Sequence, residues 1–167
     1  TRGVSYSDFR IYPASFYVRL RDMDANSCQL DFEGKTAIVT GSTRGIGRAI
    51  ADLLWDCGAS VIYTGTKRFS EVAAGERKDY WQLDASDESS VEAFQNRIMD
   101  LSSLDILVNN AGINRVDSVD GLEDGDWATV LDVNLTAPMK LMRAATKVMK
   151  NARAGGRILN VSSLFGV

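Results

Sequence analysis

The sequence of 167 residues contains no histidine, two cysteines and two prolines. The missing histidine excludes, within this sequence, a Ser-His-Asp triad, a HExxH zinc site and any proton transfer through imidazole. The two cysteines, Cys28 and Cys57, cannot build a disulfide framework, and without histidine they make a structural zinc site implausible. Such cysteine use is typical of a reducing compartment, so we expect a cytoplasmic protein without a metal ion.

Strong charge and long apolar runs are also lacking. The net charge is −3, which gives no basic surface for nucleic acid or for an anionic membrane. No run approaches the roughly 20 apolar residues of a membrane span, and the first residues lack a secretory layout. We therefore expect neither nucleic acid nor a membrane as partner. Hydrophobic residues make up 45% of the chain, which is enough for a packed core.

Two regions differ in pattern. Residues 1–33 mix aromatic residues and arginines without a sustained period, and we interpret them as an N-terminal extension with one short strand near residues 15–20. From residue 34 to 167, short apolar runs alternate with segments of helical periodicity; the runs lie at 35–40, 59–65, 79–84, 104–112 and 155–163. This alternation predicts an α/β fold, a doubly wound parallel sheet (Rossmann-like, three-layer αβα) that ends at its fifth strand.

Three segments have helix signals. Apolar residues at helical spacing between 46 and 57 predict a helix that Gly58 stops. Asp87 is an expected N-cap for a helix with an apolar stripe of Val91, Phe94, Ile98 and Leu101. A longer helix over 124–151 is apolar around much of its circumference, and we assign Leu135 and Met149 to one face, Leu141 and Val148 to another.

A glycine-rich loop, TGSTRGIG at 40–47, joins the first expected strand to the first expected helix. Its glycines follow G-x-x-x-G-x-G, which differs from the general G-x-G-x-x-G fingerprint of dinucleotide-binding proteins. Glycine allows a ligand to approach the backbone closely, and a helix N-terminus offers unpaired N–H groups to a pyrophosphate. A phosphate-binding loop is the favoured interpretation, and a tight turn without a ligand is the alternative.

Four motifs together resemble the short-chain dehydrogenase/reductase family: FEGKTAIVTGSTRGIGRAIA from residue 32, NNAG at 109–112, DVNL around Asn134, and GRILNVSS. The resemblance covers residues 32–167 and looks strongest toward bacterial reductases of 3-oxoacyl thioesters. It implies a nicotinamide-binding doubly wound sheet, in agreement with the alternation of strands and helices.

The resemblance also implies cofactor contacts. The loop would hold the pyrophosphate and the adenosine ribose, Asp84 and Ala85 would contact the adenine, and the turn after the fourth strand would line the ribose side. The residues concerned are Gly41, Ser42, Thr43, Arg44, Gly45, Ile46, Gly47, Asp84, Ala85, Asn110, Ala111 and Gly112. The alternatives are a strand-end turn residue for Asp84 and an ordinary turn for residues 110–112.

The end of the second expected strand favours NADP(H) over NAD(H). NAD sites place a carboxylate there for the ribose 2′-hydroxyl, whereas Gly65, Thr66, Lys67 and Arg68 include no acid. Arg44 in the loop, with Lys67 or Arg68, could pair with a 2′-phosphate, and Thr66 lies beside them. Alternatively, Lys67 and Arg68 are only solvated loop charges.

Asn134 is a candidate catalytic residue for a reason of its own. Pro138 lies four residues later and has no N–H, so the Asn134 carbonyl loses its usual helical donor. A free carbonyl in a kinked helix is a ready site for a water. In the family this carbonyl holds a relay water, while the alternative for Asn134 is a buried structural amide.

Ser163 is the second candidate, because the resemblance places there the serine that holds the substrate oxygen; Ser162 is its alternative. The family's Tyr-x-x-x-Lys pair follows this serine, and the sequence ends at Val167 without it. The pair Tyr63–Lys67 occurs earlier on an expected strand, where residues four apart are separated by about 13 Å, so we interpret it as a decoy.

These observations predict an NADP-dependent oxidoreductase that transfers a hydride between the nicotinamide and a carbonyl or secondary alcohol. The substrate would be a small molecule or an acyl thioester, with a 3-oxoacyl thioester favoured, and the 167-residue chain alone would be inactive. The family also implies a homo-oligomer that buries the second face of the long helix. The alternative function is a non-catalytic nucleotide-binding or interaction module.

Overall fold

The computed structural model divides into two compact units, Thr1–Leu30 and Asp31–Val167. It describes residues 30–68, 79–151 and 155–163, and all of these except Leu30 belong to the second unit. The strand expected near residues 15–20 lies outside the described residues. Among the described residues, no helix has the length and apolar character needed to cross a bilayer.

A parallel five-stranded sheet forms the centre of this unit, with the order β3-β2-β1-β4-β5. Its strands are β1 (Thr36–Val39), β2 (Ser60–Gly65), β3 (Tyr80–Gln82), β4 (Ile106–Asn109) and β5 (Arg157–Asn160). Ile38 of β1 lies opposite Ile62 of β2 and Leu107 of β4, and all three are buried. Continuous apolar runs suit such strands because helices cover both faces. The predicted doubly wound sheet is confirmed.

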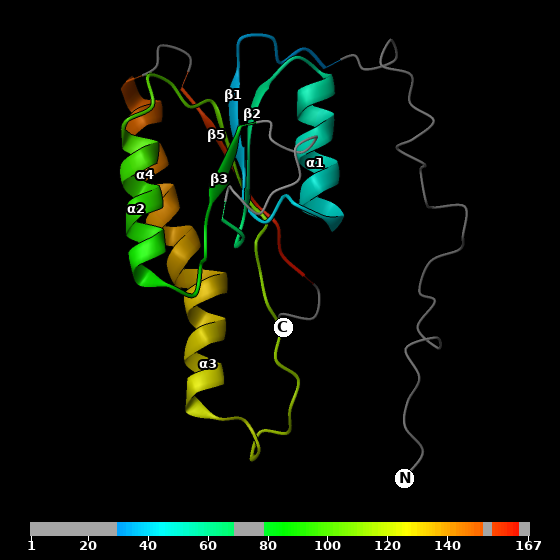
Figure 1. Ribbon diagram of the computed structural model, residues 1–167, viewed down its shortest axis with the longest axis vertical. Helices are drawn as coiled ribbons and strands as arrows, with labels where there is room; N and C mark the ends of the chain where they lie inside the picture. Colours follow the sequence, from blue (N-terminus) through cyan, green and yellow to red (C-terminus); the bar gives the residue numbers. More distant parts are fainter. Residues whose placement is uncertain (1–29, 69–78, 152–154, 164–167) are drawn as a thin grey trace, which may run out of the picture. The chain divides into compact units, whose positions relative to one another are not determined.

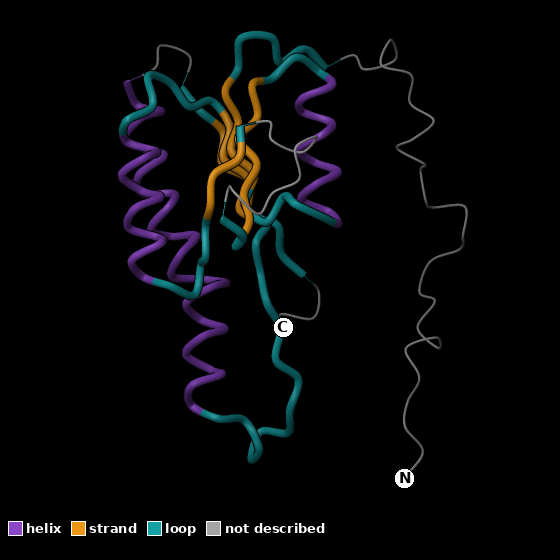
Figure 2. Tube along the Cα trace, viewed as in Figure 1, coloured by secondary structure: helices purple, strands orange, loops and turns teal. Residues whose placement is uncertain are grey.

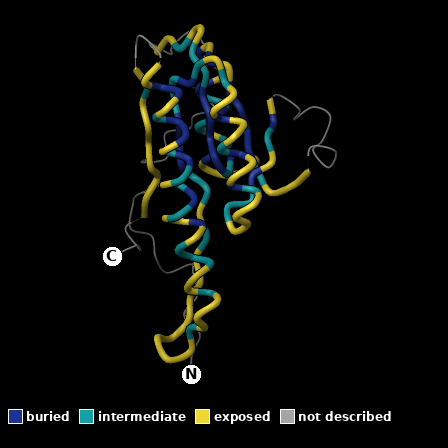
Figure 3. The backbone as a smooth tube through the Cα atoms, turned by 90° about the vertical axis from the view of Figure 1, so that its left-hand side faces the viewer, coloured by how far each residue is buried: buried dark blue, intermediate teal, exposed yellow. Residues whose placement is uncertain are grey.

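Helices form a layer on each side of the sheet (Figures 1 and 2). Helix α1 (Gly45–Asp56) packs on one face, while α2 (Glu88–Met99) and α4 (Ala137–Asn151) pack side by side on the other. Ala51 and Leu54 of α1 join the core on the first face, and Phe94, Ile98 and Leu141 belong to the core on the second. The strands β1, β2 and β4 are mostly buried, whereas β5 and many helix residues are exposed (Figure 3).

The residues predicted to begin or end helices lie at the observed helix ends. The Asp87 carboxylate accepts the Ser89 N–H at 2.9 Å and caps α2, and Val91, Phe94 and Ile98 on its stripe are buried. Hydrogen bonds from the Ser89 side chain and backbone lower the pKa of Asp87. Gly58, with φ of +96°, follows the end of α1 as predicted.

The long helix is continuous but changes its winding. It runs through α3 (Asp124–Leu131), the π-helical segment η7 (Asp132–Thr136) and α4, and the Ala137 N–H bonds to the Asp132 carbonyl five residues earlier. Pro138 at the start of α4 supplies no N–H, so the widening occurs where the sequence predicted a kink.

The predicted division of this helix into two apolar faces is wrong. Leu141, Val148 and Met149 all enter the same core, whereas Leu135 is 62% exposed. Residues 141, 145, 148 and 149 follow the spacing of a single helical stripe. The extra residue of the π-helical turn also rotates the preceding residues, Leu135 included, away from that stripe.

Strand β5 forms one edge of the sheet, and its only described neighbour is β4. All four of its residues are exposed, and Leu159 is 53% exposed. Cys57 is buried after α1, whereas Cys28 lies outside the described residues.

Candidate nucleotide-binding site

The glycine loop connects β1 to α1 at the carboxyl edge of the sheet. Gly41 and Gly45 have φ of +64° and +60°, a backbone conformation that other residues rarely adopt. Arg44 is the extended N-cap of α1, and no side chain makes a capping hydrogen bond there. The first N–H groups of α1 therefore carry the partial positive charge of the helix at an exposed loop.

Buried hydroxyl groups fasten this loop to β2. Ser42 is fully buried; its Oγ donates to the Val39 carbonyl at 2.8 Å and accepts the Thr64 N–H at 2.8 Å. Thr64 is also fully buried, and its Oγ1 accepts the Gly41 N–H at 3.0 Å. The Ser42 N–H donates to the Thr64 carbonyl at 2.9 Å. The hydroxyl and the N–H of Ser42 thus both form hydrogen bonds that hold the loop. A contact between Ser42 and a cofactor stays a prediction.

A second set of hydrogen bonds fastens the loop to the end of β4. Thr40 Oγ1 accepts the N–H groups of Asn110 and Ala111, both at 2.9 Å. Asn110 Nδ2 donates to the carbonyls of Thr40 at 3.0 Å and Gly41 at 3.3 Å. A Cβ at Gly47 would collide with this amide and with the Gly41 carbonyl oxygen. The α1 N-terminus therefore lies directly against the end of β4.

The basic residues predicted to select the cofactor are exposed at the same edge. Arg44 begins α1, and Thr66 and Lys67 follow β2, where no carboxylate occurs between Gly65 and Arg68. Thr43 and Ile46, which flank Arg44 in the loop, are exposed as well. These exposed groups surround a helix N-terminus, which is suited to an anion with more than one phosphate.

Asp84 and Ala85, the predicted adenine contacts, follow β3. Asp84 Oδ1 accepts the N–H of Ser86 at 3.0 Å and its hydroxyl at 2.6 Å, and the Asp84 N–H donates to Ser90 Oγ. The carboxylate therefore shapes the turn before α2, as the alternative interpretation held. Its contact with adenine stays a prediction.

Asn134 lies in the π-helical segment, and its side chain forms hydrogen bonds with the segment that follows β4. Its Oδ1 accepts the Ile113 N–H at 2.9 Å, and its Nδ2 donates to the Ile113 carbonyl at 2.8 Å. Gly112 is close by, since a Cβ there would lie 3.3 Å from Asn134 Oδ1. The side-chain amide thus has a structural partner, which leaves the predicted catalytic role to the main-chain carbonyl.

Ser163 follows β5 and is exposed. Asn109 and Asn160, at the ends of β4 and β5, are joined by a 2.8 Å hydrogen bond between their side chains. Asn109 Oδ1 is buried and accepts no hydrogen bond within the described part of the chain. Asn134, Asn160 and Ser163 thus follow or adjoin the carboxyl ends of β4 and β5.

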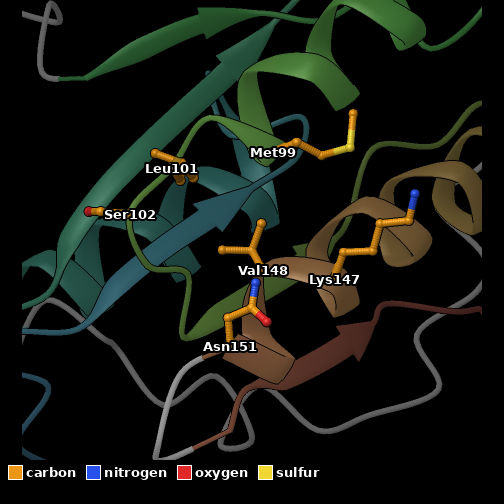
Figure 4. A pocket seen from close by; sticks show the side chains of 6 residues that line it. All are labelled: Met99, Leu101, Ser102, Lys147, Val148 and Asn151. Atoms are coloured by element: carbon orange, nitrogen blue, oxygen red, sulfur yellow. The ribbon is translucent and has the colours of Figure 1, made fainter.

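Tyr63 lies on β2, as the decoy interpretation required, and its hydroxyl donates to Asp52 at 2.8 Å; burial first, and then Asp52, raises its pKa. The described residues include no group of three potential metal ligands. A cleft of about 220 Å³ opens between the ends of α2 and α4, beyond the opposite edge of the sheet, and no predicted site residue lines it (Figure 4).

The hydrogen-bonding residues Thr40 and Thr64 were not predicted from the sequence. Thr40 directly precedes the glycine loop and offers a positional signal, but its partners lie 70 and 71 residues away. Thr64 lies on an apolar strand, and nothing near it in sequence indicates a role in the loop. Only the order of the strands brings these groups together.

Comparisons with known proteins agree with this geometry. A family model described as short chain dehydrogenase matches residues 35–167. The 3-oxoacyl-[acyl-carrier-protein] reductase of Vibrio harveyi is 42% identical over 142 residues, which are 82% of this chain and 58% of the relative. The reductase of the same name from Escherichia coli is 39% identical over 145 residues, with the same coverage.

Solved structures show the same fold. A protein described as a short-chain alcohol dehydrogenase from Sinorhizobium meliloti matches with a TM-score of 0.71 at 31% identity. One described as an NAD(P)-dependent gluconate 5-dehydrogenase from Beutenbergia cavernae, with NADP bound at low occupancy, has a TM-score of 0.69 at 32% identity. Each match covers 80% of this chain and 56% of the other. The chain thus spans under two thirds of the length of these relatives.

Proposed function

This chain belongs to the short chain dehydrogenase family, and on that premise we propose that it is the nucleotide-binding part of an NADP(H)-dependent oxidoreductase. The observation that carries the proposal is the uncapped N-terminus of α1. The loop before it is held by hydrogen bonds that Ser42 and Asn110 donate and by one that Thr40 Oγ1 accepts from the Ala111 N–H. Rigid backbone donors at a helix N-terminus suit the pyrophosphate of a dinucleotide.

NADP(H) is the proposed cofactor because the groups near the end of β2 are basic and not acidic. Arg44 and Lys67 would pair with a 2′-phosphate, whereas the end of β2 offers no carboxylate to a 2′-hydroxyl. The bound nicotinamide would supply or accept a hydride. The loop residues would bind and orient the two phosphates of the pyrophosphate, and the basic side chains would neutralise the 2′-phosphate.

The proposed reaction interconverts a carbonyl and a secondary alcohol. A 3-oxoacyl thioester is the favoured substrate, since the two bacterial 3-oxoacyl-[acyl-carrier-protein] reductases compared above are 42% and 39% identical to this chain. Ser163 would hold the substrate oxygen, and the Asn134 carbonyl would hold a water for proton relay. The proton donor would be a tyrosine tuned by a lysine, which the sequence does not contain after Ser163.

We expect the 167-residue chain to bind NADPH without oxidising it in the presence of a 3-oxoacyl thioester. General acid catalysis typically contributes about 10²–10⁴-fold, and the acid is missing here. A longer chain that continues through Tyr-x-x-x-Lys should oxidise NADPH and lose this activity in Ser163→Ala. Steady consumption by the short chain, abolished by Ser163→Ala, would contradict the proposed roles. Binding without turnover in the longer chain would support the non-catalytic module instead.

Assembly and location follow as further proposals. Trp127, Leu135 and Met139 are 55%, 62% and 38% exposed on the helix that passes from α3 to α4. A second copy of the chain would cover these side chains, so we propose a homo-oligomer. The cytoplasmic location stays a separate proposal, based on the composition of the sequence.

A further inference from the structure

The turn after β2 is held by two side chains of the neighbouring strand β3. Tyr80 Oη donates to the Lys67 carbonyl at 2.7 Å, and Gln82 Nε2 donates to the Thr66 carbonyl at 3.1 Å. Tyr80 is 6% exposed, so its hydroxyl reaches the turn from inside the core on the α1 face. Two consecutive peptide groups of the turn are thereby fixed.

Gly65 makes this arrangement possible. A Cβ at Gly65 would lie 2.7 Å from Thr43 Cγ2 and 3.1 Å from Tyr80 Oη. The Thr43 side chain of the glycine loop and the Tyr80 hydroxyl thus both lie close to Gly65 on β2. Any movement of the turn after Gly65 would change its separation from the loop that carries Arg44.

The two hydrogen bonds also set the direction of the turn. In a trans peptide the C=O and the following N–H point in opposite directions. Because Gln82 Nε2 binds the Thr66 carbonyl, the Lys67 N–H points away from the Gln82 amide. Strand β2 lies between β3 and β1, and β1 leads into the glycine loop. The carbonyl oxygens of Thr66 and Lys67, which would repel an anion, are occupied by the Gln82 and Tyr80 donors.

We propose that Tyr80, assisted by Gln82, is a positioning residue that makes the turn at Thr66 and Lys67 selective for a 2′-phosphate. It holds the Lys67 N–H and side chain toward Arg44, so that the two cations and the backbone donor share one anion. This role rests on the proposed NADP(H) dependence, because the same geometry gives no advantage to a 2′-hydroxyl.

The test compares dissociation constants of NADP⁺ and NAD⁺ by isothermal titration calorimetry for the wild-type chain, Tyr80→Phe and Gln82→Met. Tyr63→Phe is the matched control, because Tyr63 is paired with Tyr80 in the sheet and equally buried, yet its hydroxyl donates to Asp52. Thermal unfolding of each variant confirms that it is folded. Gln82→Met alters an exposed contact and provides a folded variant if Tyr80→Phe does not fold.

We expect Tyr80→Phe to lower the preference for NADP⁺ about fivefold, the effect of one net hydrogen bond, through weaker NADP⁺ binding alone. Gln82→Met should lower it in the same direction, and Tyr63→Phe should leave the ratio unchanged. If the wild type prefers NADP⁺ and the Tyr80 and Gln82 variants keep its ratio, the positioning role is overturned while the proposed function stands. If the wild type prefers NAD⁺ or binds neither nucleotide, both are overturned. An equal loss of both affinities would show a purely structural role and also overturn the inference.

Discussion

Thr40→Val tests the hydrogen bonds between the glycine loop and β4. Valine keeps the shape of the side chain but removes Oγ1, which accepts the N–H groups of Asn110 and Ala111 at 2.9 Å each. Thr40 is 2% exposed, so both donors would lose a buried acceptor. An unsatisfied buried donor costs about 1–3 kcal/mol. Because Asn110 and Ala111 are themselves only half-buried, we expect about 2 kcal/mol of lost stability in total.

Urea denaturation measures the stability, and titration with NADPH measures the binding, which we expect to weaken at least tenfold as the loop loses its position. Thr129→Val is the matched control, because the Thr129 hydroxyl donates to the Gly125 carbonyl within α3, away from the loop. It should change the stability by less than about 0.5 kcal/mol. Wild-type stability and affinity in Thr40→Val would refute the role of these hydrogen bonds.

Three further changes have defined outcomes. Gly47→Ala should reduce NADPH binding more than tenfold, because its Cβ would collide with backbone and amide atoms, whereas Gly125→Ala, with no neighbour within 4 Å, should bind normally in the same fluorescence titration. The folded pKa of Asp87 is lowered by Ser89, so its carboxylate stabilises the fold above the unfolded pKa of about 3.9 and loses this effect as the pH falls through the folded pKa. The melting temperature of Asp87→Asn should therefore differ most from that of the wild type at neutral pH and approach it toward pH 2. An equal difference in melting temperature at the two pH values would refute the stabilising role of the ionised Asp87 carboxylate. Leu135→Lys should shift the mass measured by light scattering from an oligomer toward a monomer, and a monomeric wild type would contradict the proposed assembly.

Local signals predicted much of the fold. Asp87 begins α2, Gly58 follows α1, and Pro138 coincides with the change to π-helical winding, because each effect depends on atoms within a few residues. The parallel sheet followed from strands that are apolar throughout. The apolar faces of the long helix were predicted incorrectly, since the sequence does not show how far a π-helical turn rotates Leu135.

The candidate site was predictable in position but not in detail. Strand–glycine–helix order predicted the position of the α1 N-terminus, whereas the preference for NADP(H), based on the absence of an acid after β2, stays a prediction. The hydrogen bonds that Ser42, Asn110 and Asn134 make across the fold were not predictable, because these partners lie 21 to 70 residues away and meet them only in the folded sheet. Polar residues assigned to the ligand by motif alone turn out to hold the backbone that would meet it.

The location of the nucleotide is the central claim, and amide chemical shifts test it most directly. We propose a titration of the ¹⁵N-labelled 167-residue chain with NADPH, followed by heteronuclear NMR. The amides of Gly45, Ile46 and Gly47 should shift most, in a saturable manner, while those of Met99 and Leu101 in the cleft at the opposite edge should stay unchanged. Saturable shifts confined to the cleft, or no shifts at the N-terminus of α1, would contradict the account.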